Sequence, residues 1–414
     1  MEVKILGSGN EVGRASIMLT SEKKRFLFDH GVNVKAMDYP IEPKMPIDAV
    51  FLSHAHLDHS GNLPHLYKRG YNGKIFATPT TFDLTNMLLR DSLKVQKLKG
   101  LTPQYMPDHM NQMGRRERGM RYREKIKIGQ AVAELRGAGH TPGSSTTLLE
   151  VDGKRILYTG DINFIETELL RPADTKFKDI DMLITEATYT YKDHPDRKKL
   201  GEELRKKAAD IINSGGTLIM PSFAVGRTQE MLLILSKLDF PIYMDGMGID
   251  ATRRAMLHTD SVRNIKKLRN AFSKAQKISR PNQRKKAIEK PSIVITTSGM
   301  LSGGPVNWYI KNLHKREDCS LILSGFQCEN TTGRTLLDTG RYINEGLDIK
   351  PKFNIEFMDF SSHCGRSDLI NFIKNVNAKK TILVHTESGP KFANELKDMN
   401  IDAVAPKNGE IIGI

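Results

Sequence analysis

The sequence contains little cysteine and almost no tryptophan. Its 414 residues include three cysteines, Cys319, Cys328 and Cys364, and one tryptophan. Three scattered cysteines cannot build a disulfide framework or a cysteine-rich zinc site, so a reducing compartment is favoured. The first apolar stretch is interrupted by Lys4, and no later apolar run reaches the roughly 20 residues of a membrane-spanning helix. We therefore expect a soluble, cytoplasmic protein that does not enter a membrane.

Positive charge is present in excess. Lysine and arginine total 63 against 48 aspartate and glutamate residues, which gives a net charge of +15. Such an excess predicts a polyanionic partner. The alternative is that the charge has no specific partner, because the lysines only keep the protein soluble or because all proteins of the organism are basic. The length predicts two structural domains, and an apolar content of 39% is enough to bury a core in each.

The strongest chemical signal is the hexapeptide His54-Ala55-His56-Leu57-Asp58-His59, which follows the apolar run 49–52 with only Ser53 between them. Alternate side chains of an extended segment share a face, so His54 and His56 can converge on one ion. Asp58 and His59 come one turn later, where a second ion could bind. Imidazole and carboxylate groups together suit zinc. A solvated histidine-rich loop is the alternative, and the preceding buried strand argues against it.

Further candidate ligands also follow predicted strands. They are His140, Asp161, Glu186 and His385. Each alone would more often be structural, but strands that deliver metal ligands to one rim are what a metal site requires. We predict that one ion is held by His54, His56 and His140, the other by Asp58, His59 and His385, with Asp161 bridging them. Two zinc ions about 3.5–4 Å apart would activate a water molecule and polarise a phosphoryl oxygen.

Between residues 191 and 342 the pattern changes to alternating helices and strands. Amphipathic stretches such as 198–213 are predicted helices, 252–290 is predicted as one basic helical stretch, and apolar runs such as 216–221 are predicted strands. This alternation predicts a parallel α/β domain. Candidate metal ligands are found before and after this region, so we expect the domain to be an insertion within the metal-binding domain. A last hairpin is predicted over residues 404–414.

A run rich in arginine and methionine covers residues 106–127. Its arginines are Arg115, Arg116, Arg118, Arg121 and Arg123. We interpret this run as a solvated face.

The motifs together resemble the β-CASP family of the metallo-β-lactamase superfamily, close to archaeal homologues of the cleavage and polyadenylation specificity factor nuclease and to RNase J. The matching positions are Asp29, His54 to His59, His140 and Asp161 for the first four motifs, then Glu186, His363 and His385 for motifs A, B and C. The resemblance covers nearly the whole chain. It implies an α/β fold in which an αββα sandwich, residues 1–188 and 347–414, carries an inserted parallel α/β cap, residues 189–346.

The resemblance also implies an activity. Family members of this type are zinc-dependent ribonucleases with two Zn²⁺ per chain, which hydrolyse single-stranded RNA as 5′-to-3′ exonucleases, endonucleases or both, in RNA processing or decay. RNA would enter between sandwich and cap, and a histidine at motif C favours RNA over DNA. Members often dimerise, so we expect a homodimer. The longer archaeal members carry KH domains before the sandwich, and their absence from this sequence favours a general degradative role.

Roles for single residues follow from the same resemblance. Asp58, Glu186 and His363 are the predicted catalytic residues, with Glu186 holding His363 as the general acid that protonates the leaving 3′ oxygen. Asp29 would orient a metal-bound imidazole. The predicted contacts to RNA or its phosphates are Arg227, Ser298, Arg334, Ser361 and Ser362, and lysines of the cap would add a general electrostatic surface.

One position departs from the family pattern. Motif B usually continues with a small and then an acidic residue, whereas Cys364-Gly365-Arg366 follows His363 here. This leaves the conformation of the loop open. Cys364 is either a buried, inert thiol, which we favour, or a metal ligand.

Two other functions remain alternatives. A small-molecule hydrolase would use the same ligands, but it gives no reason for a large inserted basic domain. A non-catalytic RNA-binding subunit of a processing complex would fit the charge, but every ligand position of the family is filled here.

Overall fold

The computed structural model describes residues 1–22, 24–344 and 346–413. The chain forms two compact units, and its path crosses between them more than once. Unit 1 comprises Met1–Glu166, Arg171–Asp193 and Ser362–Ile414, and unit 2 comprises Thr167–Leu170 and His194–Ser361. Among the described residues, no helix is long and apolar enough to cross a membrane.

Unit 1 contains two mixed sheets. In spatial order, the described strands of the first sheet are β22 (Ile411–Gly413), β1 (Glu2–Gly7), β2 (Ser16–Thr20), β3 (Arg25–Phe28), β4 (Ala49–Phe51), β5 (Ile75–Ala77) and β6 (Glu117–Gly119). Those of the second sheet are β21 (Ala403–Val404), β20 (Lys380–Val384), β11 (Met182–Glu186), β10 (Lys154–Tyr158), β9 (Ser145–Val151), β8 (Ala131–Gly137) and β7 (Lys125–Ile128).

The two sheets pack face to face because alternate side chains of each strand are apolar. Phe26 and Phe28 of β3 enter the same core as Tyr158 of β10. Leu27, which lies between the two phenylalanines, faces the opposite side and packs in a separate core. Each fully buried phenylalanine contributes roughly 1.5–3 kcal/mol of transfer free energy. Because successive side chains of a strand point to opposite faces, the same strand contributes to the core between the sheets and to the core on the outer face of its sheet.

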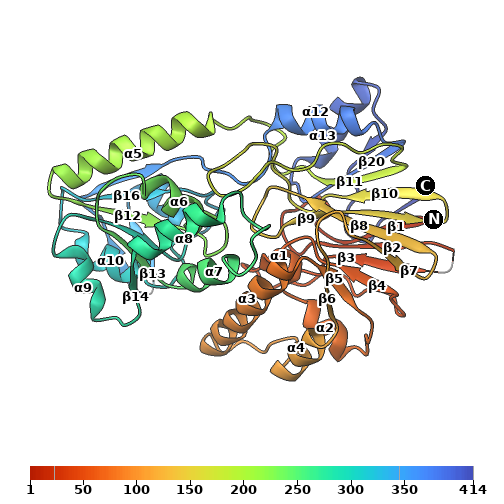
Figure 1. Cartoon of the computed structure of the whole chain (residues 1–414), viewed down its shortest axis with the longest axis horizontal. Coiled ribbons are helices and arrows are strands. Elements are labelled where there is room, and N and C mark those ends of the chain that lie inside the picture. Colours follow the sequence, from red (N-terminus) through yellow and green to blue (C-terminus); the bar gives the residue numbers. More distant parts are fainter. Residues whose placement is uncertain (23, 345, 414) are drawn as a thin grey trace. The chain divides into compact units, whose positions relative to one another are not determined.

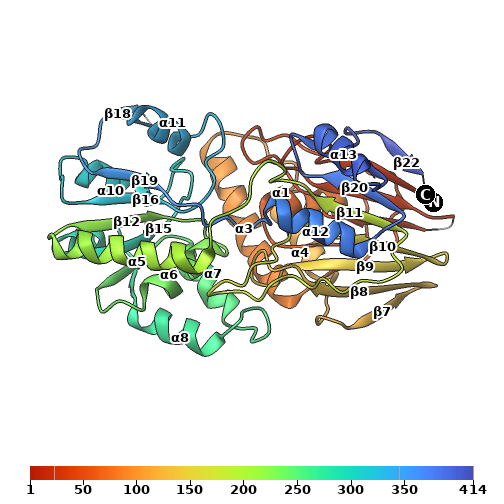
Figure 2. The same ribbon diagram turned by 90° about the horizontal axis from the view of Figure 1, so that it is seen from above.

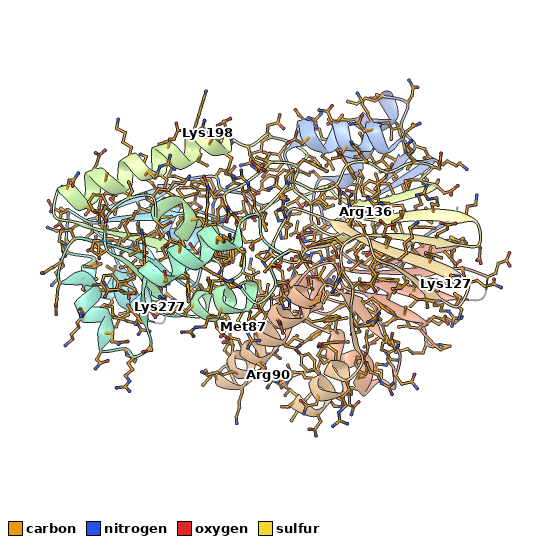
Figure 3. All side chains as sticks on the ribbon, viewed as in Figure 1. Met87, Arg90, Lys127, Arg136, Lys198 and Lys277 are labelled. Atoms are coloured by element: carbon orange, nitrogen blue, oxygen red, sulfur yellow. The ribbon has the colours of Figure 1, made fainter. Side chains whose placement is uncertain are left out.

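Helices cover both outer faces of the sandwich (Figure 1). The first sheet is covered by α2 (Leu63–Lys68), α3 (Pro79–Leu98) and α4 (Pro107–Gly114), and the second by α12 (Arg366–Val376) and α13 (Gly389–Asp398). Figure 2 shows α12 and α13 lying over the strands of the second sheet. Of the two α3 residues labelled in Figure 3, Met87 is buried and Arg90 is exposed. The layers follow the αββα order expected from the sequence.

Unit 2 is built around a parallel sheet. Its described strands, in spatial order, are β14 (Gln276–Ile278), β13 (Ile242–Asp245), β15 (Ser292–Thr296), β12 (Thr217–Pro221), β16 (Ser320–Leu323) and β19 (Asn354–Phe357). Apolar cores lie on both faces. The helices are α5 (Arg197–Asn213), α6 (Arg227–Leu235), α7 (Gly248–Ala255), α8 (Ile265–Lys274), α9 (Gln283–Ile288), α10 (Val306–Leu313) and α11 (Thr332–Thr339), and a hairpin joins β17 (Tyr342–Asn344) to β18 (Leu347–Ile349).

The exposed residues of unit 2 follow the amphipathic pattern of its helices. Lys198 of α5, labelled in Figure 3, is exposed, whereas Leu200 and Leu204 of the same helix are buried against the sheet. Lys277, also labelled, lies over the ring of Phe272 at 4.5 Å from its centroid. The alternation of helices and strands predicted for this region is confirmed by the parallel pairing.

Two details of the expected secondary structure are wrong. The segment 252–290 is not one helical stretch, because β14 pairs in parallel with β13 and separates α8 from α9. The last hairpin does not form among the residues described to 413. Instead, β21 pairs with β20 in the second sheet and β22 with β1 in the first. The two strands follow each other in sequence but pair with strands of different sheets. Their closeness in sequence therefore wrongly suggested that they pair with each other.

The chain segment 347–361 belongs to unit 2 by its contacts. The sequence placed the second part of the sandwich from residue 347 onwards. In the structure β19 pairs in parallel with β16, and unit 2 continues to Ser361. The sequence of β19 does not show whether the strand joins the sheet of unit 2 or a sheet of the sandwich. How far the compact units correspond to the expected domains stays a prediction.

Candidate metal centre

The predicted ligands converge on one rim of the sandwich in unit 1. The hexapeptide directly follows β4, Asp161 follows β10, Glu186 ends β11 and His385 follows β20. Among the residues that the structure describes, four overlapping groups of ligand atoms lie close enough together to hold a metal ion. These groups are His54, His56, His140 and Asp161; His54, Asp58 and His59; His59, Asp161 and His385; and Asp161, Glu186 and His363.

The first ligand group has the spacing of a tetrahedral site. Nδ1 of His56 lies 3.2 Å from Nε2 of His54 and 3.2 Å from Nε2 of His140. Oδ2 of Asp161 lies 3.6 Å from Nε2 of His54 and 3.5 Å from that of His140. Atoms bound tetrahedrally to zinc at about 2.0–2.1 Å are about 3.3–3.4 Å apart. Four nitrogen and oxygen atoms therefore surround one point at distances that fit a metal ion.

The second group uses the other oxygen of the same carboxylate. Oδ1 of Asp161 lies 3.3 Å from Nε2 of His59. Oδ2 of Asp58 lies 3.3 Å from Nε2 of His385 and 4.0 Å from Nε2 of His59. The two oxygens of Asp161 thus face two different sets of imidazoles, which is the arrangement of a bridging carboxylate.

Two atoms of this cluster lack the hydrogen bonds that burial demands. His59 is 1% exposed and Asp161 is 2% exposed, yet His59 Nε2 and Asp161 Oδ1 make no hydrogen bond of acceptable geometry within the described part of the chain. A buried polar atom without a partner costs about 1–3 kcal/mol. A metal ion between these atoms would satisfy both, so the donor set fits the metal cofactor that the sequence predicts.

The backbone beside the hexapeptide permits this close packing only at glycine. The amide of His30 donates to the carbonyl of His59, and the amide of Ala15 donates to that of Asp58. A Cβ atom on Gly31 would lie 1.7 Å from the Asp58 carbonyl oxygen. The loop that carries Asp58 and His59 is therefore seated directly against residues 30 and 31.

Two residues of the site that directly follow strands have a strained backbone conformation. Asp29 and His385 adopt φ values of 55° and 53°, in the left-handed region that side chains other than glycine rarely occupy. Such strained positions persist where the surrounding structure fixes them, and they gather at functional sites. Here the turn aims each side chain back across the rim.

Asp29 holds the imidazole of His59 in place. Its Oδ2 accepts from Nδ1 of His59 at 2.7 Å and from the hydroxyl groups of Ser53 and Tyr158, each at 2.6 Å. The amide of Ser53 also donates to Oδ1. Fixing the proton on Nδ1 leaves Nε2 free to bind metal. This contact fits the orienting role expected for Asp29, which stays a prediction.

Two further imidazoles are oriented in the same manner. Nδ1 of His140 lies 3.0 Å from the carbonyl oxygen of Ser362, which can only accept, so Nε2 of His140 is the deprotonated atom directed into the cluster. Nδ1 of His385 lies 3.1 Å from the hydroxyl of Thr188. The same hydroxyl donates to Glu186. Thr188 therefore links Glu186 of motif A to His385 of motif C.

The electrostatics of the cluster favour neutral imidazoles in the first ligand group. Burial lowers the pKa of His54, His56 and His140, assisted by the neighbouring imidazoles. The pKa of His59 moves in the opposite direction. Burial lowers it, but the carboxylates of Asp161 and Asp58 outweigh burial and raise it well above its usual value. A metal cation would take the place of that proton, because ligation requires the neutral form.

His363 lies beside the cluster and is held by Glu186. Nδ1 of His363 is 3.0 Å from Oε1 and 2.9 Å from Oε2 of Glu186. The amide of Ile162 donates to the same carboxylate at 2.7 Å, which fixes its orientation. Burial lowers the pKa of His363, but the carboxylates of Glu186 and Asp161 outweigh burial and raise the pKa to about 9. With 21% of its side chain exposed, His363 is positively charged near neutral pH and accessible.

The unusual sequence after His363 has a structural basis. Cys364 is buried among Leu369, Phe372 and other apolar side chains, and burial raises the pKa of its thiol. Within the described chain it belongs to none of the ligand groups, which supports the interpretation as an inert thiol. Arg366 donates to the carbonyl of Thr190 and pairs with Glu395 at 2.7 Å. The loop is therefore anchored by an arginine.

The five residues predicted to contact RNA are divided between the two units. Arg227, Ser298, Arg334 and Ser361 belong to unit 2, and Ser362 belongs to unit 1. Arg334 pairs with Asp338 at 2.8 Å. Ser362 contributes its backbone carbonyl to His140. Contacts of these five residues to RNA stay a prediction.

Three hydroxyl-bearing residues of the site were missed in the sequence. They are Ser53, Tyr158 and Thr188. Ser53 is adjacent to the hexapeptide and Thr188 lies two residues after Glu186, so proximity to the motifs could have indicated both. Tyr158 reaches Asp29 across the inner core, and no local pattern reveals that contact.

Comparison with known proteins agrees with the geometry. The chain matches the Metallo-beta-lactamase superfamily over residues 9–210, the Beta-Casp domain over residues 228–336, and the Zn-dependent metallo-hydrolase RNA specificity domain over residues 347–406. A crystal structure of a protein of unknown function from Enterococcus faecalis V583 superposes with a TM-score of 0.65 at 16% identity, covering 100% of this chain and 99% of that one. At this identity the likeness supports the fold alone.

Curated relatives match over the whole length. The chain is 36% identical to "Probable RNase MJ4" from Methanocaldococcus jannaschii, with 100% of both chains covered. It is 32% identical to "RNase aCSPSF2" from Saccharolobus solfataricus, covering 100% of this chain and 85% of that one. It is 31% identical to "Transcription termination factor FttA" from M. jannaschii, covering 98% and 72% respectively.

The fold and the clustered ligands define a metal-dependent hydrolase of the metallo-β-lactamase superfamily. Membership of this superfamily implies metal ions as cofactors. Within it, the chain belongs to the β-CASP family of ribonucleases, together with its archaeal relatives.

Proposed function

We propose that this protein is a zinc-dependent ribonuclease that hydrolyses phosphodiester bonds of single-stranded RNA. The observation that supports it most directly is the position of Asp161, whose two oxygens face separate sets of imidazoles. Two such sites side by side suit two Zn²⁺ ions per chain, and family membership supplies RNA as the substrate.

His54, His56, His140 and Asp161 would hold one ion, and His59, His385 and Asp161 the other. Asp58, whose Oδ2 lies 3.3 Å from Nε2 of His385, would complete the second set. When bound, paired zinc ions supply an activated water molecule and neutralise charge on the phosphoryl oxygens. The remaining work belongs to the protein. Asp29 fixes the imidazole of His59 through Nδ1, and the Ser362 carbonyl fixes that of His140. Both contacts keep the ligand nitrogens aimed at their ions.

His363 is the proposed general acid. Its Nδ1 lies against both carboxylate oxygens of Glu186, and in this proposal its other ring nitrogen, Nε2, donates to the substrate. A protonated imidazole there can give its proton to the leaving 3′ oxygen, so the upstream product ends in a 3′ hydroxyl and the downstream product begins with a 5′ phosphate. Asp58, with 28% of its side chain exposed, is the more accessible carboxylate of the second ligand group and would contact the reacting water.

Replacing Glu186 by glutamine should move the alkaline limb of the pH–rate profile to lower pH. The Glu186 carboxylate raises the pKa of His363 against burial, so removing its charge lowers that pKa. The acid form of His363 is present below its pKa and is lost as pH rises through it. The loss must therefore begin at lower pH in Glu186→Gln. The measurement is kcat/KM on labelled RNA between pH 6 and about pH 10.

Exposed Glu150 provides a matched control, because Glu150→Gln removes the same charge from β9. Its profile should superimpose on that of the unmodified protein. Metal content should be unchanged in both variants. An alkaline limb that stays in place in Glu186→Gln would contradict the assignment of His363 as the acid.

The division between exonuclease and endonuclease activity requires three substrates. Linear RNA with a 5′ monophosphate, linear RNA with a 5′ triphosphate, and circular RNA should be compared at equal concentration. Cleavage of the circle demonstrates endonuclease activity, and a preference for the monophosphate demonstrates a site for the terminal phosphate. No cleavage of any of the three by zinc-loaded protein would contradict the proposed function.

We also propose that the enzyme acts in the cytoplasm as a homodimer. Family membership and the scarcity of cysteine support this proposal. Light scattering during size-exclusion chromatography should give twice the mass of one chain.

A further inference from the structure

The arginine run of unit 1 contains a dense strip of exposed positive charge. Residues 115–127, called the basic strip below, include seven arginine or lysine residues and two glutamates. All seven cationic side chains are exposed, and they are Arg115, Arg116, Arg118, Arg121, Arg123, Lys125 and Lys127. The strip therefore supplies a net charge of +5 from thirteen residues, against +15 for the whole chain.

The basic strip crosses the side of the sandwich. Its first part includes β6, the last strand of the first sheet, and its final part includes β7, the last described strand of the second sheet. The residues between them connect the two sheets. Lys127 of β7 and Arg136 of the neighbouring β8 are both labelled in Figure 3. The cationic residues of the strip therefore follow the chain from the edge strand of the first sheet to that of the second.

A hollow of about 580 Å³ lies in the middle of the strip. Pro79 and residues 118–124 line it, so three arginines, Tyr122 and one glutamate contribute to one concave surface. Guanidinium groups bind phosphate through paired hydrogen bonds, and aromatic rings stack on bases.

Two of the three arginines that line the hollow pair with local carboxylates, and both pairs are exposed. Arg118 pairs with Glu124 at 3.4 Å, and Arg123 pairs with Asp174 at 2.9 Å. The two arginine side chains are 53% and 66% exposed, and exposed pairs of this kind contribute little and exchange easily. The side chain of Arg121 forms no ion pair with any residue that the structure describes.

The hollow adjoins the loop that carries His140. The hydroxyl of Tyr122 donates to the carbonyl of Ser144 at 3.0 Å. The side chain of Ser144 accepts from the amides of His140 and Thr141, at 3.2 and 3.1 Å. A ligand in the hollow would therefore lie against residues that hold a metal ligand in place.

Protection of the sheet edges explains only part of the strip. Lysines on edge strands discourage pairing with another chain, which accounts for Lys125 and Lys127. It does not account for Arg115, Arg121 and Arg123, which lie outside the strands. It also gives no reason for a concave surface that collects arginines.

We propose that the basic strip is an accessory binding surface for single-stranded RNA. The hollow binds phosphates of the substrate outside the metal centre, and the strip guides the strand across the edge of the sandwich. This inference rests on the proposed ribonuclease function. It adds a second site on the substrate, with Arg118, Arg121 and Arg123 as its phosphate-binding residues.

The test is the triple variant Arg118→Gln/Arg121→Gln/Arg123→Gln. Its control is Lys374→Gln/Lys391→Gln/Lys397→Gln, which removes the same charge from exposed positions on α12 and α13. Because α13 packs beside β20 and β21, Lys391 and Lys397 lie at the opposite end of the second sheet from β7. Affinity is measured by fluorescence anisotropy with RNA of about 30 and about five nucleotides, over a range of salt concentrations.

The triple variant should bind the long RNA about 10- to 100-fold more weakly at about 0.1 M salt, with the slope of log K against log salt reduced by about 2. Its kcat/KM on the short RNA should equal that of the unmodified protein, and the control variant should match the unmodified protein on both substrates. Equal weakening in both variants would overturn the proposal. The proposal would also be overturned if the triple variant kept its affinity for long RNA but self-associated. That result would show that the charges protect the sheet edges from pairing with another chain.

The outcomes separate this proposal from the proposed function. If the unmodified protein cleaves RNA and the triple variant matches it on both substrates, the accessory surface is refuted and the ribonuclease remains. If binding of long RNA depends on the strip but zinc-loaded protein cleaves nothing, the surface is supported and the ribonuclease function is refuted.

Discussion

Replacing Asp161 by alanine is expected to remove most of the bound metal and to lower RNA cleavage on the order of a thousandfold or more. Oδ2 of Asp161 belongs to one ligand group and Oδ1 to the other, so this single change weakens both sites. A thousandfold loss corresponds to about 4 kcal/mol of barrier. Metal per chain, measured by elemental analysis, should fall together with the rate of cleavage of labelled RNA.

Asp179 offers a matched control because its side chain is 90% exposed. Asp179→Asn should keep full metal content and activity, since asparagine also tolerates the positive φ of that position. Circular dichroism should show both variants folded. An Asp161→Ala protein that retains its metal and most of its activity would contradict the bridging role.

Replacing His363 by alanine is expected to slow cleavage by about 10²- to 10⁴-fold while leaving the metal content unchanged. His363 lies 2.9 Å from Glu186 and is charged near neutral pH, so its loss removes a proton donor. Although Oδ2 of Asp161 is 4.0 Å away, the other ligand atoms around the two proposed ions remain complete.

A substrate with sulfur in place of the bridging 3′ oxygen tests that role directly. A thiolate leaves without protonation, so the general acid is no longer needed for this bond. The difference between the unmodified protein and His363→Ala should largely disappear on the sulfur substrate. An equal loss on the oxygen and sulfur substrates would show that His363 positions the RNA and does not donate a proton.

The metal-binding part of the site was predictable because its signals are local. Four potential ligands within the hexapeptide, shortly after a buried strand, indicated a metal site without any tertiary information. His140, Asp161 and His385 were recognised because each follows a predicted strand, and strand ends meet at one rim of the sandwich. The resemblance to a known family then supplied the order of the motifs.

Other features depend on contacts between distant segments. The hydroxyl of Tyr158 reaches Asp29 through the inner core, and 129 residues separate them in the chain. Likewise, β21 and β22 are neighbours in sequence but join different sheets. Neither hydrophobic periodicity nor turn residues identify such partners, because both patterns describe only which face of a strand is buried.

The basic strip illustrates how much a local pattern leaves open. The sequence identified its arginines and suggested a solvated face. The side chains are indeed exposed. Only the fold, however, brings Arg118, Arg121, Tyr122 and Arg123 around a hollow beside the His140 loop.

The account's central claim is that two zinc ions in this ligand cluster perform RNA hydrolysis. Zinc should be removed with a chelator and then titrated back while cleavage of a labelled single-stranded RNA is followed. The ligand geometry predicts no cleavage without metal and a plateau of activity at two zinc ions per chain. Full cleavage by metal-free protein, or a plateau reached at one ion with no second binding event, would contradict it.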